Sequence, residues 1–362
     1  MTLFIDNETA ARLIAPRDVI GALDTAYQAF GRNLNVCAPR FDFQSGENAQ
    51  GEAYQLGLAV GLGSEGYACV RVKSDMVFQT LVNGARRKQK YCVEPGTYLG
   101  LLLVFDMANG ALRAIVQDGH VQRMRVGADS ALGVRYMARA DAATLGVLGA
   151  GGMARSHVDA IAAVRDLMRV RVYSPTPANR EAFAAEARDR LGIEVEAVAR
   201  PEDVYAGADI VSACTNAIGP VVDGRLLEPG MHVTCIGGTL DETANARVDR
   251  ALRFGTAGGP LEIDGWDFRD ESLTFAVGGA KSGHGTARRF HDVPAERQIR
   301  FADLLDDPSI GRTADSQITF SERGNIHGIQ FAAVTGLIYE RARDAGLGVD
   351  LGAPFFLQDI RN

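Results

Sequence analysis

The sequence predicts an α/β protein in which a Rossmann domain is inserted into a discontinuous α+β domain. Three observations support this fold class. A glycine-rich turn joins a strand to a helix in the middle of the chain, and strands alternate with helices after it. The region before the turn is patterned differently and includes several strand-like runs. We expect residues 131–317 to form the Rossmann domain, and residues 1–130 with 318–362 to form the other domain.

The glycine-rich turn follows the apolar run Thr144–Leu148, which is typical of a short buried strand. The next six residues have the pattern G-x-G-x-x-A, and a helical pattern continues over 155–164. The first glycine permits the tight turn, the second lets the backbone approach a diphosphate, and the alanine lets helix and strand pack closely. This context favours dinucleotide binding over a merely structural turn. The expected contacts are Gly149, Gly151, Gly152, Met153 and Ala154.

The second nucleotide strand, expected over 169–174, bears on which dinucleotide is bound. An NAD enzyme usually ends this strand with Asp or Glu for the ribose 2′-hydroxyl, but no acid stands here. Ser174, Thr176 and Arg180 offer hydroxyls and a guanidinium that suit a 2′-phosphate. The segment could also be an ordinary loop with a solvated arginine. We therefore expect NADP(H) as the favoured cofactor, with NAD(H) as the alternative.

Composition excludes several classes of protein. The 362 residues suit two domains, and the net charge of −7 argues against nucleic acid or an anionic membrane as partner. Five cysteines without a C-x-x-C pair predict neither a disulfide framework nor a zinc site. The six histidines show no metal-ligand spacing, and no apolar run reaches membrane-spanning length. We expect a soluble, cytoplasmic, metal-free protein.

The remaining elements follow from periodicity. Before the turn we expect a helix over 18–33, strands over 54–60, 67–73, 98–105 and 112–116, and a helix over 126–138. After it we expect strands over 194–198, 209–213, 232–236 and 252–256, a long inserted loop over 258–296 and a helix over 327–345. The strands of the first region lack enough helices to cover both faces of a sheet. Because an exposed apolar face normally marks an interface, we expect a homodimer.

Several short motifs follow one another in a characteristic order along nearly the whole chain. They are Ala38–Arg40, Val70–Lys73, Arg125–Ala131, the glycine turn, Gly237–Gly238, Gly311–Thr313, Ile318–Phe320, Gly328–Gln330 and a helix ending at Gly348. In this the sequence resembles the ornithine cyclodeaminase/μ-crystallin family. The resemblance implies a substrate-binding domain that also pairs the subunits. It also implies a reaction drawn from ornithine or lysine cyclodeamination, amino-acid dehydrogenation, imine reduction or nearly non-catalytic cofactor binding.

Three basic residues are candidates for substrate binding. Arg40 follows a proline in an extended segment, and Arg125 is expected just before a helix, where the dipole disfavours a cation. A guanidinium can hold a carboxylate through two hydrogen bonds. Lys73 ends an apolar strand and is expected on the same face as Arg71 and Cys69; the resemblance makes it the active-site lysine. Each of the three could instead be a solvated side chain. We also expect Thr215, Asn216 and Gly237, which follow later strands, to contact the cofactor.

The sequence departs from the family at two places. Many members carry Asp directly after Gly237–Gly238, where this chain has Thr239, with Asp241 nearby. A threonine cannot shuttle protons as a carboxyl group does, so either Asp241 takes that role or the acid is absent. Phe331 occupies a second position where the family has Asp. His327 could donate a proton to the developing amine, or bond to backbone at a helix start.

The function we expect is NAD(P)H-dependent reduction of a small imino acid (a ketimine) to an amino acid, or the reverse dehydrogenation. The alternatives are an ornithine or lysine cyclodeaminase and a crystallin-like protein that binds NADPH without catalysis. The loops 83–90 and 281–289 are basic despite the acidic total. If they fold over the site, they would favour a substrate with an additional acidic group; otherwise they are solvated.

Overall fold

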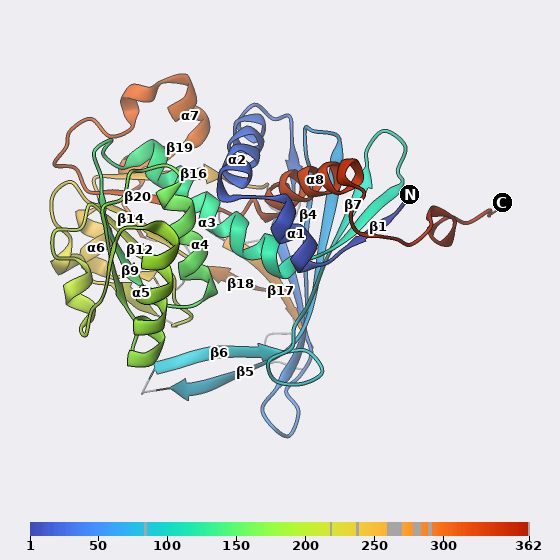
Figure 1. Cartoon of the computed structure of the whole chain (residues 1–362), viewed down its shortest axis with the longest axis horizontal. Helices are drawn as coiled ribbons and strands as arrows, with labels where there is room; N and C mark the ends of the chain where they lie inside the picture. Colours follow the sequence, from blue (N-terminus) through green and yellow to red (C-terminus); the bar gives the residue numbers. More distant parts are fainter. Residues whose placement is uncertain are drawn as a thin grey trace.

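The computed structural model describes residues 1–82, 85–217, 219–236, 239–258, 270–277, 284–288 and 292–360. Two large β-sheets stand on either side of the long helix α3 (Asp118–Met137), as Figure 1 shows. Helix α3 contacts strands of the second sheet on one side and helices of the N- and C-terminal regions on the other. Helix α3 therefore joins the two halves of the molecule along the chain and also packs against both of them.

The second sheet is a doubly wound parallel sheet, as the sequence predicts. Its strands are β9 (Thr144–Leu148), β10 (Arg169–Tyr173), β11 (Glu194–Ala197), β12 (Ile210–Ala213), β14 (His232–Cys235), β16 (Arg250–Gly255), β19 (Gln298–Arg300) and β20 (Thr319–Gly324). Their spatial order is β11-β10-β9-β12-β14-β20-β16-β19, and every neighbouring pair is parallel. The order reverses between β9 and β12. Such a switch point leaves a crevice at the carboxyl ends of the strands, where ligands bind.

Helices and short elements accompany this sheet. The helices are α4 (Gly152–Ala162), α5 (Pro177–Leu191), α6 (Glu242–Arg247) and α7 (Phe301–Asp306). A small separate sheet pairs β13 (Pro220–Val222) with β15 (Thr239–Leu240). Among the described residues, no helix is both long enough and apolar enough to span a membrane.

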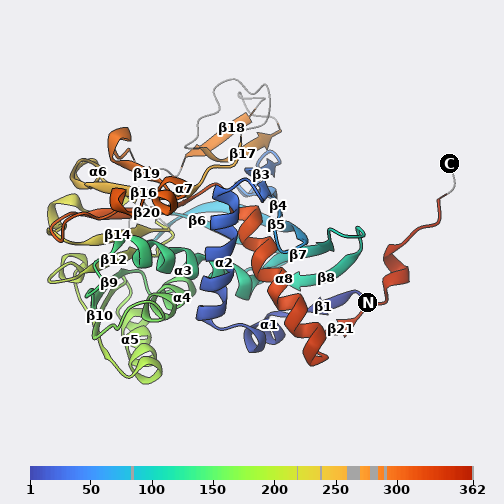
Figure 2. The ribbon, with the colours of Figure 1, turned by 90° about the horizontal axis from the view of Figure 1, so that it is seen from above.

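The first sheet combines antiparallel and parallel strands. Its members are β1 (Leu3–Ile5), β2 (Val36–Cys37), β3 (Arg40–Gln44), β4 (Ala53–Leu62), β5 (Tyr67–Val82), β6 (Ala85–Tyr91), β7 (Leu99–Asp106), β8 (Leu112–Gln117), β17 (Asp270–Ala276), β18 (His284–Arg288) and β21 (Val349–Asp350). Helices α1 (Asn7–Leu13), α2 (Pro16–Gly31) and α8 (His327–Ala345) accompany it. Figure 2 shows α2 and α8 side by side near this sheet, and α8 contacts β4 and β5.

Alternation along β5 places charged residues on the inner face of the first sheet. Cys69, Arg71 and Lys73 are buried, whereas Val70 and Val72 are partly exposed on the other face. This confirms the predicted sidedness of the strand. An inward row of charged side chains is unusual for a sheet face packed on helices, and it indicates that part of this face lines a polar site.

Four expectations about the elements were wrong. Residues 258–296 do not form only a loop, because β17 and β18 lie within this range and β17 pairs with β3 in the first sheet. Stacking of Phe275 on Phe43, with ring centroids 5.2 Å apart, helps to hold β17 there. Residues 85–90 of the expected loop 83–90 form most of β6. Strand β20 belongs to the second sheet, although residues 318–362 were expected in the other domain.

The fourth difference concerns the start of α3, which begins at Asp118 rather than near 126. The backbone N–H of His120 donates to Asn7 Oδ1 over 2.7 Å, so a side chain from α1 secures the first turn. Glycine and polar residues in this turn obscure the helical pattern in the sequence. Arg125 therefore lies within the helix and not before its N-terminus. The argument from an unfavourable helix dipole does not apply to it.

Candidate active site

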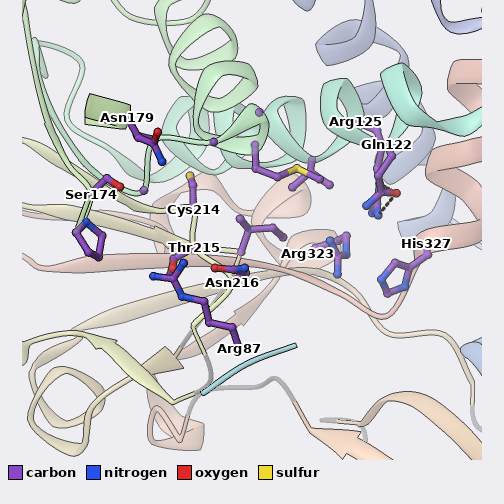
Figure 3. A pocket seen from close by; sticks show the side chains of 18 of the residues that line it. Arg87, Gln122, Arg125, Ser174, Asn179, Cys214, Thr215, Asn216, Arg323 and His327 are labelled. Atoms are coloured by element: carbon purple, nitrogen blue, oxygen red, sulfur yellow. Dashed lines mark hydrogen bonds between the residues drawn. The ribbon is translucent and has the colours of Figure 1, made fainter. Parts of the chain in front are cut away.

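A cavity of about 470 Å³ lies where β9 and β12 end and where the inner face of the first sheet approaches them. Figure 3 shows side chains from both halves of the molecule around it. The nucleotide side contributes Gly149–Met153, Ser174, Pro175, Asn179, Cys214, Thr215, Asn216 and Ile236. The other lining residues are Arg40, Arg71, Arg87, Gln122, Arg125, Val126, Arg323 and His327.

The glycine turn is shaped for a diphosphate. Gly149 has a φ of +124°, and a Cβ there would lie 2.3 Å from the carbonyl oxygen of Cys214. A Cβ on Gly151, in contrast, would meet no atom within 4 Å, so the backbone is open at this position. Helix α4 begins at Gly152 with its free N–H groups at the cavity, and Ala154 is fully buried against the strand. A dinucleotide fits this turn as the sequence predicts.

The other residues expected to contact the cofactor divide into two groups. Ser174 lines the cavity, as do Thr215 and Asn216 at the end of β12. Thr176 is exposed, and Arg180 donates to the carbonyl oxygen of Ser174 over 2.9 Å; neither belongs to the lining. Asn179, in the first turn of α5, lines the cavity instead and was missed by the sequence analysis. Gly237 lies outside the described residues.

Arg125 is the most deeply buried cation at the cavity, with 2% of its surface exposed. Its guanidinium donates to Oε1 of Gln122 over 2.8 Å and to Oε1 of Gln330 over 2.5 Å. Burial, then the charges of Arg323 and Arg71, lower the pKa of Arg125, yet a guanidinium stays protonated at neutral pH. A buried positive charge that bonds to neutral amides is suited to binding an anion.

Two further arginines surround Arg125. Arg71, on the same face of β5 as Lys73, pairs with Asp118 over 2.6 Å. Arg323, at the end of β20, is 8% exposed and points into the cavity beside His327 in Figure 3. The ring of Phe331 contacts the guanidinium groups of Arg125 and Arg71, with its centroid 4.8 Å from Arg125 Cζ and 5.1 Å from Arg71 Cζ. Phe331, which stands where the family is expected to have Asp, thus adds no charge and packs against two cations.

Arg40 and Lys73 lie next to this group on the inner face of the first sheet. Arg40 lines the cavity and pairs with Asp42 over 2.6 Å. The Lys73 ammonium lies 3.3 Å from Asp75 and 3.8 Å from Asp42, and Lys73 is not among the residues that line the cavity. Burial lowers the pKa of Lys73 to about 8, although the nearby Asp42 opposes the shift. The lysine can therefore gain or lose a proton close to neutral pH.

A buried polar network supports Arg125 from behind. Gln330 of α8 donates to Tyr27, and the Tyr27 hydroxyl donates to Oδ1 of Asp129 over 2.5 Å. Burial raises the pKa of Asp129, and it raises that of Tyr27 further. These links join α2, α3 and α8, so the position of Arg125 is fixed by three helices. The sequence analysis found none of these partners, because they are distant along the chain.

Comparison with known proteins agrees with this architecture. The model of the ornithine cyclodeaminase/mu-crystallin family matches residues 73–253, half of the chain. The chain belongs to this family. A Δ1-pyrroline-2-carboxylate reductase of Bacillus cereus is 26% identical over 255 residues, which cover 70% of this chain and 74% of that protein. The membership confirms the resemblance seen in the sequence.

Solved structures of the same fold were also found. The Thermococcus litoralis Δ1-pyrroline-2-carboxylate reductase in complex with NADH and L-proline has a TM-score of 0.74 at 21% identity; the match covers 96% of this chain and all of that chain. An archaeal alanine dehydrogenase dimer with bound NAD has a TM-score of 0.72 at 19% identity, and the match covers 96% of this chain and 98% of that chain. These similarities establish the fold.

The family's acidic position is the clearest departure of this chain. Thr239 begins β15, where its backbone N–H donates to Gly219, and it does not line the cavity. Asp241 is the N-cap of α6, and its Oδ1 accepts from the backbone N–H groups of Gly224 and Ala244 over 3.0 and 2.7 Å. Its carboxylate is thereby held in a structural role away from the cavity. The displacement of the acid to Asp241, which the sequence left open, gains no support.

His327 is the first residue of α8 and is 2% exposed. It lines the cavity on the side of Arg125 and Arg323, as Figure 3 shows. This placement keeps it as a candidate proton donor. Among the described residues, no cluster of His, Cys, Asp or Glu could hold a metal ion.

Proposed function

We propose that this family member reduces a small imino acid to an amino acid with NAD(P)H, or catalyses the reverse dehydrogenation. The observation that carries the proposal is the shared cavity. The diphosphate-shaped turn at Gly149–Met153 and the buried Arg125 line the same space. A bound dihydronicotinamide would supply a hydride there. The named relatives that reduce Δ1-pyrroline-2-carboxylate support this reaction class.

The residues of the cavity divide the task between binding and proton transfer. Arg125 and Arg40 would hold the α-carboxylate, since guanidinium groups bind carboxylates through paired hydrogen bonds. His327, at the cavity surface, is placed to protonate the nitrogen, and Lys73 would assist with its titratable ammonium. Substrate orientation by the arginines would bring the imine carbon to one fixed position.

We further propose that the substrate carries a second acidic group. The described lining includes Arg40, Arg71, Arg87, Arg125 and Arg323, together with His327, but no Asp or Glu. Within this set, Arg40 pairs with Asp42 and Arg71 with Asp118, and Arg125 is assigned to the α-carboxylate. Arg323 lies beside Arg125 and His327, and its guanidinium is placed for the carboxylate of a side chain.

Replacement of Arg323 by Gln tests this substrate class. We expect kcat/KM for imines of dicarboxylic 2-oxo acids to fall about 10- to 100-fold, because a hydrogen bond to a charged group contributes roughly 1.5–3 kcal/mol. The value for imines of monocarboxylic 2-oxo acids should stay unchanged. Equal losses for both classes, or a wild-type protein that prefers monocarboxylic substrates, would contradict the second acidic group.

We propose NADP(H) as the preferred cofactor and NAD(H) as the weaker one. The described end of β10 presents Ser174 to the cavity, and no carboxylate stands there to repel a 2′-phosphate. Comparison of NADPH and NADH oxidation over a panel of 2-oxo acids with ammonia or methylamine tests both the reaction and the preference. Tight cofactor binding with complete inertness across the panel would favour the crystallin-like alternative.

The cyclodeaminase alternative has less support than the reductase. Ring closure with loss of ammonia needs several proton transfers, and Asp241 is occupied as a helix cap. That reaction regenerates its cofactor, so it is detected by ammonia release from ornithine or lysine. Robust release without net cofactor oxidation would replace our proposal.

We also propose a homodimer that pairs through the outer face of the first sheet. On β4, β5, β7 and β8 this face presents partly exposed apolar side chains, namely Leu56, Leu58, Val60, Val70, Val72, Leu101, Leu103 and Ile115. A continuous apolar face of this kind normally marks an interface, and a two-fold dimer is the commonest closed solution. A related structure is an archaeal alanine dehydrogenase dimer.

A cytoplasmic location is proposed on the state of the cysteines. All five are free thiols, and Cys69 and Cys214 are buried in the core. Proteins of oxidising compartments more often pair their cysteines.

A further inference from the structure

Strand β5 is longer than the sheet that contains it. Its first half, Tyr67–Ser74, pairs with β7, and its second half, Met76–Val82, pairs with β6. Because the pairing of β5 with β4 ends at Val77, the part of β5 from Phe78 onward and its partners in β6 form a two-stranded ribbon that leaves the rest of the first sheet. Figure 1 shows this ribbon extending beneath the half of the molecule that contains the second sheet.

The ribbon reaches the nucleotide side of the cavity. An isolated antiparallel bridge pairs Arg87 of β6 with Ala217. Ala217 belongs to the segment after β12 that also carries Thr215 and Asn216, and its N–H donates to the Thr215 hydroxyl over 3.1 Å. The ribbon thus spans the two halves of the molecule and ends beside the carboxyl end of a central nucleotide strand.

The side chain of Arg87 is directed into the cavity. It is one of the lining residues, and Figure 3 shows its guanidinium near Thr215 and Asn216, on the opposite side from Arg125 and His327. Its Nε is buried without a hydrogen-bond partner in the structure. No described lining residue is acidic, so the cavity itself offers this guanidinium no counter-charge. A buried guanidinium nitrogen to which no protein atom bonds is available to donate to an anion.

We propose that Arg87 is a phosphate-binding residue for the dinucleotide. It belongs to the first sheet, and the β5–β6 ribbon places it beside the nucleotide-binding strands. This inference rests on the proposed function only in that a dinucleotide binds at the glycine turn. A guanidinium suits phosphate oxygens because its donors lie in one plane and can bond to two of them. The ribbon would close the cofactor between the two halves, which the glycine turn alone cannot do.

Two phosphate groups share this chemistry, namely the diphosphate bridge and the 2′-phosphate of NADP(H). The cavity offers one binding element for each phosphate group: the glycine turn for the diphosphate and Ser174 for the 2′-phosphate. Arg87 approaches from the opposite wall, so it adds a contact that neither element supplies. The two sources differ in what the loss of Arg87 does to NADH, which has only the diphosphate.

Cofactor titration by fluorescence separates these cases. Dissociation constants for NADPH and NADH are measured with the full-length wild type and with Arg87→Met, Arg87→Lys and Lys88→Met variants. Lys88→Met is the matched control, because it removes one charge from the same strand and its ammonium bonds to Gln55 over 3.0 Å instead of lining the cavity. Thermal unfolding of each variant shows whether it is folded.

We expect Arg87→Met to raise the dissociation constant at least tenfold, Arg87→Lys to raise it less, and Lys88→Met to leave it within twofold. A rise for NADPH alone assigns Arg87 to the 2′-phosphate, and an equal rise for both cofactors assigns it to the diphosphate. Unchanged constants in a folded Arg87→Met protein overturn the inference and leave the proposed function intact. A wild type that binds neither cofactor overturns both.

Discussion

Single residues determine how much of the site is visible in the sequence. The glycine turn was predicted residue by residue because its chemistry is local: tight turn, open backbone and helix start follow one another within six positions. The basic lining was predicted only in part. Arg71 shares the face of Lys73 by alternation and could have been selected on that ground. Arg323 and Asn179 are brought to the cavity by tertiary structure, which no local pattern encodes. Arg87 was anticipated only as a member of the basic segment 83–90 that could fold over the site.

The pKa of Lys73 gives a prediction at the same scale. Because this pKa is lowered to about 8, the ammonium loses its proton as pH rises through that value. The neutral amine can neither attract a carboxylate nor donate a proton as an ammonium does. We therefore expect kcat/KM for imine reduction to decline above about pH 8.

Lys73→Arg provides the test, since a guanidinium stays protonated over this range. The variant should be slower than the wild type and should lose the descending limb of the pH profile. Retention of the same limb in Lys73→Arg would assign the titration to another group.

At the scale of elements, sequence patterns predicted a helix or strand correctly where its apolar residues repeat regularly. They failed where charged residues interrupt the repeat. Helix α8 was predicted with its observed bounds, because its apolar residues repeat at helical spacing. Strand β20 was missed as a member of the second sheet, since Glu322 and Arg323 interrupt its apolar pattern. The structure compensates Glu322 through Arg253, 2.7 Å away, a pairing that the sequence does not reveal.

The packing of α3 on α4 makes a second prediction. A Cβ on Gly127 would lie 2.3 Å from the backbone oxygen of Ser156, so the two helices approach closely only because this residue is glycine. We expect Gly127→Ala to destabilise the protein by about 1–3 kcal/mol, the usual cost of overpacking. Denaturant unfolding measures the change.

Gly21→Ala is the matched control in α2, because its added Cβ would meet nothing within 4 Å. Removal of a helical glycine in open space should stabilise by roughly 0.5–1 kcal/mol. The prediction fails if the two substitutions change stability equally.

At the scale of the whole molecule, the uncovered face of the first sheet predicts the assembly. Light scattering at micromolar concentration should give twice the monomer mass of 38.7 kDa. Val72→Glu places a charge in the centre of the apolar face and should yield monomers, whereas Leu34→Glu, at a residue already 64% exposed, should not. A monomeric wild type would contradict the dimer.

The central claim is that hydride passes from the nicotinamide cofactor to the carbon of an imino acid held by Arg125. Its most direct test is a reaction with NADPH that carries deuterium at the transferable position of the dihydronicotinamide. The account predicts an amino acid product with deuterium at its α-carbon, and severe loss of that product in Arg125→Gln. Cofactor binding without any labelled amino acid from the substrate panel would contradict it.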